Sequence, residues 1–196
     1  MSKIVKAVVF LTLFCGLTAG PEQLAMSEDT SSALIQLSLF SPVQLVDSRR
    51  AVAGFRLGIV PVNSEMVGLD IGAVTWTSGD LAALQLGLVN VVEGEAIGVQ
   101  FAWANIVAGR GVGWQTAPLN ITGDGYIGFQ DGMVNINGGK ASVGFQLGAV
   151  NYSSQFSGLM LGLVNITPRL SGLQIGIVNY AGNSALPIFP IANAAF

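Results

Sequence analysis

The sequence contains no histidine, and its only cysteine is Cys15, near the N-terminus. The remainder of the chain therefore lacks a disulfide pair, a thiol nucleophile and the usual ligands of zinc and haem. Charged residues make up only 10% of the 196 residues, against about 25% in an average soluble domain. The carboxylates that remain stand mostly one to a turn, so we expect no enzyme activity and no cofactor.

Apolar residues, in contrast, make up 51% of the chain, and the net charge is −3. Nucleic-acid-binding proteins carry basic stripes, so this composition excludes that class of partner. Such a small number of charged residues cannot cover the surface of a soluble domain. We therefore expect a large apolar surface that meets a lipid bilayer or an apolar ligand.

The N-terminal segment has the pattern of an export signal. Lys3 and Lys6 precede an apolar core over residues 7–14, which is followed by small residues. This pattern predicts a signal peptide over 1–25, a linker over 26–33 and a single repeat domain over 34–196. Cys15 raises the alternative of a lipoprotein, but Phe14 is bulky where a small residue is expected, so an ordinary cleaved signal is preferred. The expected location is the outer membrane or the cell surface, with the periplasm or secretion as alternatives.

A short unit recurs along the domain. Gly172-Leu-Gln-Ile-Gly-Ile-Val-Asn179 is preceded by close copies at 158–165 and 144–151, and looser copies begin 14 to 16 residues apart back to Gly54. Weaker copies lie at 34–41 and 186–193. Self-similarity at a short fixed period indicates a repeat architecture.

Each unit has the alternation of a β-strand. The second, fourth and sixth residues are nearly all apolar, whereas the other face carries Gly, Gln, Gly and Val. The spacers between units are rich in Gly, Asn, Asp and Pro, which favour turns. The sequence therefore predicts an all-β domain with one strand per repeat and no helix between Ala51 and Tyr180.

Two architectures fit one strand per repeat, and we favour a closed up-and-down β-barrel of about ten short strands over a parallel β-solenoid. Alternation persists for about 11 residues, or roughly 36 Å, which three or four spacer residues cannot bridge back to the start of a solenoid coil. A solenoid remains open if the strand bends at the second Gly or the Asn of the unit. The apolar C-terminal segment 186–196 also favours closure over an open stack, which needs polar caps.

In such a barrel the small Gly/Gln face lines the interior and the Leu/Ile/Phe face points outward, toward lipid. Arg56 and Asp70 discriminate between the two architectures, because both replace the usual Gln in consecutive repeats. In a parallel solenoid they stack directly; in an antiparallel barrel Arg56 faces Val74 and Asp70 faces Val60, and any contact between the two charges is diagonal.

The unit and the C-terminal tail Leu186, Pro187, Pro190, Asn193 and Phe196 resemble a family of bacterial exported surface repeat proteins built from Gly-Leu-Gln-Leu-Gly-Leu-Val-Asn units. Some of these are similar to the shallow symmetric barrels called β-flowers. The resemblance covers Leu34 to Phe196. It implies an exported, membrane-associated or surface location and brings no activity. Thr116, Pro118 and Asp131 depart from the unit.

Thr116 and Asp131 are the candidate site residues, because they interrupt the apolar face in neighbouring repeats. An acid on a lipid-facing surface is costly, which suggests a ligand or oligomer contact; a strand that bends away at Pro118 is the structural alternative.

The favoured function is a non-enzymatic outer-membrane or membrane-associated barrel with a structural, narrow-pore or lipid-contact role. The alternatives are a secreted or surface solenoid acting as an interaction or adhesion module, and a small exported barrel that binds an apolar ligand. The sequence does not settle the oligomeric state.

Overall fold

A computed structural model describes residues 32–196 of the chain. The expected signal peptide, Cys15 and most of the expected linker lie outside these residues. The described part is all-β and contains no helix, as the repeat pattern predicted. No helix capable of crossing a membrane therefore occurs between residues 32 and 196.

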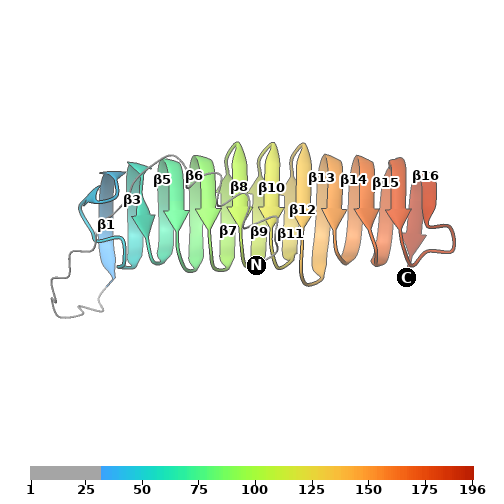
Figure 1. Ribbon diagram of the computed structural model, residues 1–196, viewed down its shortest axis with the longest axis horizontal. Coiled ribbons are helices and arrows are strands. Elements are labelled where there is room, and N and C mark those ends of the chain that lie inside the picture. Colours follow the sequence, from blue (N-terminus) through green and yellow to red (C-terminus); the bar gives the residue numbers. More distant parts are fainter. Residues whose placement is uncertain (1–31) are drawn as a thin grey trace.

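The strands follow one another along the long axis of the molecule (Figure 1). They are β1 (Ala33–Phe40), β2 (Val43–Gln44), β3 (Val52–Val60), β4 (Val62–Asn63), β5 (Met66–Thr77), β6 (Leu81–Val92), β7 (Ala96–Phe101), β8 (Ala104–Val107), β9 (Gly111–Thr116), β10 (Leu119–Thr122), β11 (Tyr126–Asp131), β12 (Val134–Asn137), β13 (Ser142–Ser153), β14 (Phe156–Thr167), β15 (Leu170–Ala181) and β16 (Ile188–Ala195).

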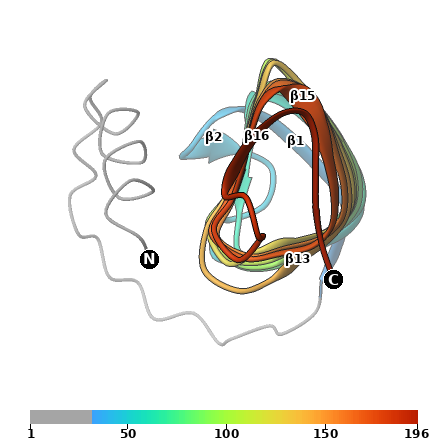
Figure 2. The ribbon, with the colours of Figure 1, turned by 90° about the vertical axis from the view of Figure 1, so that its right-hand side faces the viewer.

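The repeats form a parallel β-solenoid of about ten coils, and the closed barrel is wrong. Successive repeats pair in parallel and in register, so that Gly144, Gly158 and Gly172 lie side by side. Viewed down the axis, the coils superimpose on one another (Figure 2). Pairing is antiparallel only at the two ends, between β1 and β2 and between β15 and β16.

The barrel prediction failed because it assumed a straight strand. The coils bend within the repeats (Figure 2); in the middle of the molecule the bend follows the fourth residue of the unit and separates β7 from β8, β9 from β10 and β11 from β12. The backbone of the bend bonds to the adjacent coil, as in Ala102 N–H to the Thr116 carbonyl at 3.1 Å. Because of the bend, a spacer of three or four residues is long enough to close the coil. Such a bend is the condition on which the solenoid alternative depended.

The prediction about the two faces is confirmed in the solenoid. The Gly/Gln face is interior and the large apolar side chains point outward. Seven glutamines are buried inside the coils: Gln36, Gln85, Gln100, Gln115, Gln130, Gln146 and Gln174. The last Asn of the unit is buried as well, in Asn90, Asn105, Asn120, Asn135, Asn151, Asn165 and Asn179.

The buried amides form two hydrogen-bonded ladders that run in opposite directions. In the Gln ladder each amide donates to the preceding coil, as Gln100 does to Gln85 at 2.7 Å. In the Asn ladder each amide donates to the following coil, as Asn151 does to Asn165 at 2.8 Å, and its second hydrogen bonds the Leu161 carbonyl at the bend of that coil. Buried polar groups thereby obtain partners within the stack.

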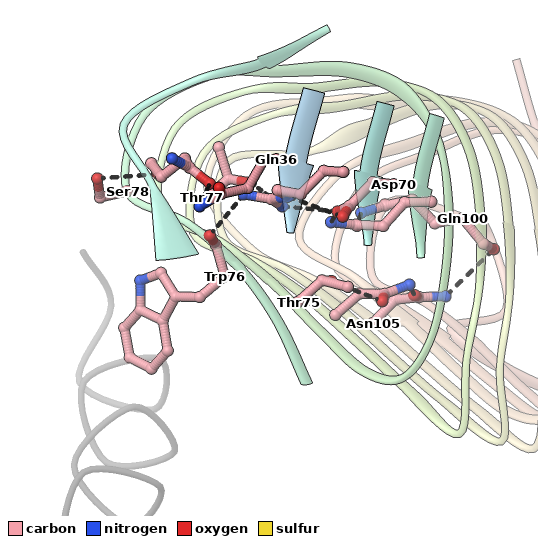
Figure 3. A network of polar contacts seen from close by, with 12 residues as sticks. Gln36, Asp70, Thr75, Trp76, Thr77, Ser78, Gln100 and Asn105 are labelled. Atoms are coloured by element: carbon pink, nitrogen blue, oxygen red, sulfur yellow. Dashed lines mark hydrogen bonds and ion pairs between the residues drawn. The ribbon is translucent and has the colours of Figure 1, made fainter. Parts of the chain in front are cut away.

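Arg56 and Asp70 stack directly, as the solenoid alternative required. They are register partners in β3 and β5, and both side chains are fully buried. The guanidinium makes two bonds to the carboxylate, Nε–Oδ1 at 2.7 Å and Nη2–Oδ2 at 2.6 Å. Gln85 donates to the same carboxylate at 2.8 Å, so Asp70 is the terminal acceptor of the Gln ladder (Figure 3).

Met160 takes the Gln position in β14 and interrupts the ladder. The Gln146 and Gln174 Oε1 atoms, in the coils on either side of it, are buried and have no hydrogen-bond partner. Gln174 donates instead to the Met160 sulfur at 3.4 Å, which is a weak acceptor.

The first prediction concerns Gly162 in β14. A Cβ there would clash with the Gly148 carbonyl oxygen and lie 2.6 Å from the Asn151 amide nitrogen. We expect Gly162→Leu to lower the free energy of unfolding by at least about 1–3 kcal/mol, measured by urea denaturation. Ser171→Leu is the control, because Ser171 is exposed on the outer surface. Equal stability of the two variants would contradict a crowded interior.

The second prediction concerns the buried ion pair. Arg56→Gln alone leaves the Asp70 carboxylate buried without its cation, and we expect it to cost about 3–5 kcal/mol of unfolding free energy. The double variant Arg56→Gln/Asp70→Gln continues the Gln ladder through both coils and should lie close to the wild type in stability. A double variant as unstable as the single one would show that the pair has a role that two amides cannot fill.

The third prediction concerns the interruption at Met160. Met160→Gln offers a donor to Gln146 Oε1 and an oxygen acceptor to Gln174, so we expect it to raise the free energy of unfolding by about 1 kcal/mol. Met66→Gln is the matched control. Met66 is buried in an apolar cluster with Val52, Leu81 and Val92, where an amide has no ladder to join, and this variant should be destabilised. Loss of stability in Met160→Gln would contradict the ladder.

Candidate functional site

The most prominent surface feature is a broad apolar sheet. We call it the apolar face: the outward side of β1, β3, β7, β9 and β11 together with the first halves of β5, β6, β13, β14 and β15. Its large exposed side chains include Ile35, Leu37, Leu57, Val67, Leu84, Ile97, Phe101, Trp114, Val143, Leu147 and Ile175. The bend continues the surface with Ile59, Leu88, Trp103, Met133, Leu163 and Ile177, which are also exposed.

The charged side chains lie elsewhere, on a turn edge. The turns that lead from one coil to the next stack on each other, as in Gly94 N–H to the Gly79 carbonyl at 3.0 Å. They carry every charged residue of the described part except Arg56, Asp70 and Asp131. At this edge the Lys140 ammonium, 2.8 Å from the Asp124 carboxylate, holds the pKa of Asp124 below its usual value. The Arg49 guanidinium, likewise by hydrogen bonding, lowers the pKa of Asp47.

The structure brings the two candidate residues together. Thr116 ends β9, Asp131 ends β11, and the two are register partners on neighbouring strands of the apolar face. Both lie just before the bend, which falls at the same place between β7 and β8, so Pro118 marks the regular bend rather than a local distortion. The Thr116 hydroxyl oxygen is buried and has no hydrogen-bond partner. Asp131 is the one acid on the described apolar face.

An aromatic row borders this pair, and our sequence interpretation missed it. The ring centroids lie 5.8 Å apart for Phe101–Trp114, 5.6 Å for Trp114–Phe129 and 5.2 Å for Phe129–Phe145. The signal was present in the sequence: the second residue of the units that begin at Gly113, Gly128 and Gly144 is aromatic each time. Register stacking of identical unit positions turns this recurrence into a continuous row.

An open apolar cavity of about 690 Å³ lies at the N-terminal end of the face, between β1, β2 and β3. Leu37, Leu39, Val43, Leu45, Leu57 and Ile59 line it. Its polar lining groups are already engaged in part, because the Gln44 amide nitrogen bonds the carbonyls of Val46 and Val62 at 2.7 and 3.0 Å. The cavity offers apolar contact and no group for catalysis.

Reactive chemistry has little support in the described residues. No group of three or more Cys, Asp or Glu side chains that could hold a metal ion occurs among residues 32–196. Burial raises the pKa of the Tyr126 hydroxyl, which donates to the Phe129 carbonyl at 3.3 Å. This tyrosine packs inside the coil and meets no base. The outer surface offers apolar contacts along the apolar face, together with the polar side chains of Thr116 and Asp131.

No family model, curated protein or solved structure matches the chain. The resemblance to exported surface repeat proteins therefore stays a prediction from the repeat unit. The geometry of the solenoid and of its outer surface is therefore the basis for assigning a function.

Proposed function

We propose that this protein is a non-enzymatic interaction module, exported to the cell surface, that docks a protein partner on its apolar face. The observation that carries the proposal is the row of exposed Leu, Ile, Val, Phe and Trp side chains along the apolar face. The export part rests on the pattern of residues 1–25, and the absence of enzyme activity on the composition of the chain.

The size of the face supports a docking role. At about 4.8 Å between strands and about 3.3 Å per residue, ten strands of six residues cover roughly 45 by 20 Å, or about 900 Å². Monomeric soluble proteins rarely expose more than about 300–600 Å² of contiguous apolar surface. A standard protein–protein interface buries about 800 Å² on each partner. The apolar face therefore has the area of one complete interface.

The construction of the core also supports it. The ladders of hydrogen-bonded amides, with the buried Arg56–Asp70 pair, hold the strands in a single register. The interior thus needs little from the outward apolar side chains, which are left free for a partner. A rigid, pre-ordered surface loses little conformational entropy on binding.

Three features favour a protein over a lipid bilayer as the occupant. Asp131 lies on an inner strand of the face, between β9 and β13, where hydrocarbon would make a carboxylate costly. The described sheet also ends in open edges, as at β16, and such edges do not occur in contact with lipid hydrocarbon. Aromatic side chains at the centre of a face are typical of protein-binding hot spots.

The fourth prediction tests the docking role by site-specific photocrosslinking. Benzoylphenylalanine at Leu147, on the apolar face, should form a crosslink with one distinct protein in the cells that produce the chain. The same group at Glu65, on the turn edge, is the matched control and should not form this adduct. An adduct at Leu147 with lipid, an adduct with a second copy of the chain, or no adduct at all would each contradict the proposal.

A further inference from the structure

Thr116 and Asp131 form a polar pair without hydrogen-bond partners on two inner strands of the apolar face, β9 and β11. The half-buried Asp131 makes no ion pair in the structure, whereas the fully buried acid, Asp70, is paired with Arg56. The Thr116 hydroxyl is buried and has no hydrogen-bond partner, although it lies next to Asp131 in register. A carboxylate accepts hydrogen bonds and donates none, so the group that complements the pair is a donor.

The surroundings of the pair define that donor further. Phe129 and Met133 lie two residues before and after Asp131 on the same run of chain, and Trp114 stacks edge-on against Phe129 at 5.6 Å. Residues two apart on a strand are separated by about 6.6 Å on one face. The Phe129 ring is therefore an immediate neighbour of the carboxylate on the same face, where it can contact a long cationic side chain bound there, and aromatic rings attract cations.

We propose that this pair is the receptor for an arginine side chain of the protein partner. Of the two long cationic side chains, arginine is the better fit, because its planar guanidinium donates two parallel bonds to a carboxylate and stacks on aromatic rings. Asp131 takes the bidentate contact, Trp114 and Phe129 carry the flat side of the group, and Thr116 borders the carboxylate on the neighbouring strand. The apolar residues around the pair exclude water from the contact, as the rim of a hot spot does.

The proposal rests on the docking role of the apolar face and adds the chemistry of its centre. It also explains why two polar residues stand between Phe101 and Leu147, which occupy this position in the coils on either side of the pair. A partner without a cation at this point leaves the carboxylate desolvated and unpaired, so the acid selects against it.

The fifth prediction uses small probes on the purified, isotope-labelled chain, followed by NMR. Phenethylguanidinium should shift the amide signals of Thr116 and Asp131 and the indole signal of Trp114. It should bind about tenfold or more tightly than neutral phenethylurea, because a charge-assisted bond is lost in the urea. Asp131→Asn should remove this difference. Asp80→Asn, which removes one charge from the turn edge, is the matched control and should leave it unchanged.

Equal binding of the guanidinium and the urea probes, or an Asp131→Asn variant that binds both as the wild type does, would overturn the arginine receptor. The crosslink at Leu147 separates this failure from failure of the docking role. A Leu147 adduct that persists unchanged in Asp131→Asn leaves the docking role standing and contradicts the receptor. An adduct that is lost in Asp131→Asn and retained in Asp80→Asn supports both.

Discussion

Hydrogen bonding between side-chain amides inside the coil is the constraint on which the rest of this structure depends. An amide buried without a partner is costly, and the interior offers each Gln and Asn mainly the same residue one coil away. The ladders therefore fix the register: a shift of one residue would turn every amide outward and every Leu inward. Repeats of 14, 15 and 16 residues are accommodated because the length difference falls in the turns, as in Asn135 to Asn151 and Asn151 to Asn165.

The direction of each ladder follows from a fixed acceptor. Asp70 can only accept, so Gln85 must donate to it, and each later Gln is oriented in turn until Met160 interrupts the sequence. The Asn ladder is oriented by the carbonyls at the bend, which take one hydrogen of each amide. The buried ion pair thus satisfies two charges and also selects one of two orientations for the amides that follow. An isolated buried pair is weak evidence of stability, whereas a pair that orders a ladder contributes to specificity.

The repeat unit was sufficient to predict strands, turns and the identity of the buried face, because period-two alternation depends only on local side-chain direction. It did not determine strand direction, since a parallel coil and an antiparallel hairpin give the same alternation. The charged residues Arg56 and Asp70 discriminate between parallel and antiparallel strands. The barrel was nevertheless favoured, because the length estimate treated each strand as straight. At the site, Thr116 and Asp131 were visible as exceptions to the pattern. The aromatic row next to them requires register stacking, which follows only once the strands are known to be parallel.

The ends of the solenoid explain why the face is the surface left for a partner. Polar caps were expected of an open stack, and the described ends instead carry antiparallel strands. At the N-terminal end the Val46 backbone bonds both polar atoms of the Gln36 amide, at 2.8 and 3.0 Å, and so closes the Gln column. At the C-terminal end β16 contains Pro190, which lacks an N–H, and Ile191 in a left-handed conformation at φ 71°, where the pairing with β15 is irregular. Proline and irregular pairing at an edge strand oppose the addition of a further strand. Growth of the stack is thus disfavoured at β16, and the apolar surface that remains for association is the side of the solenoid.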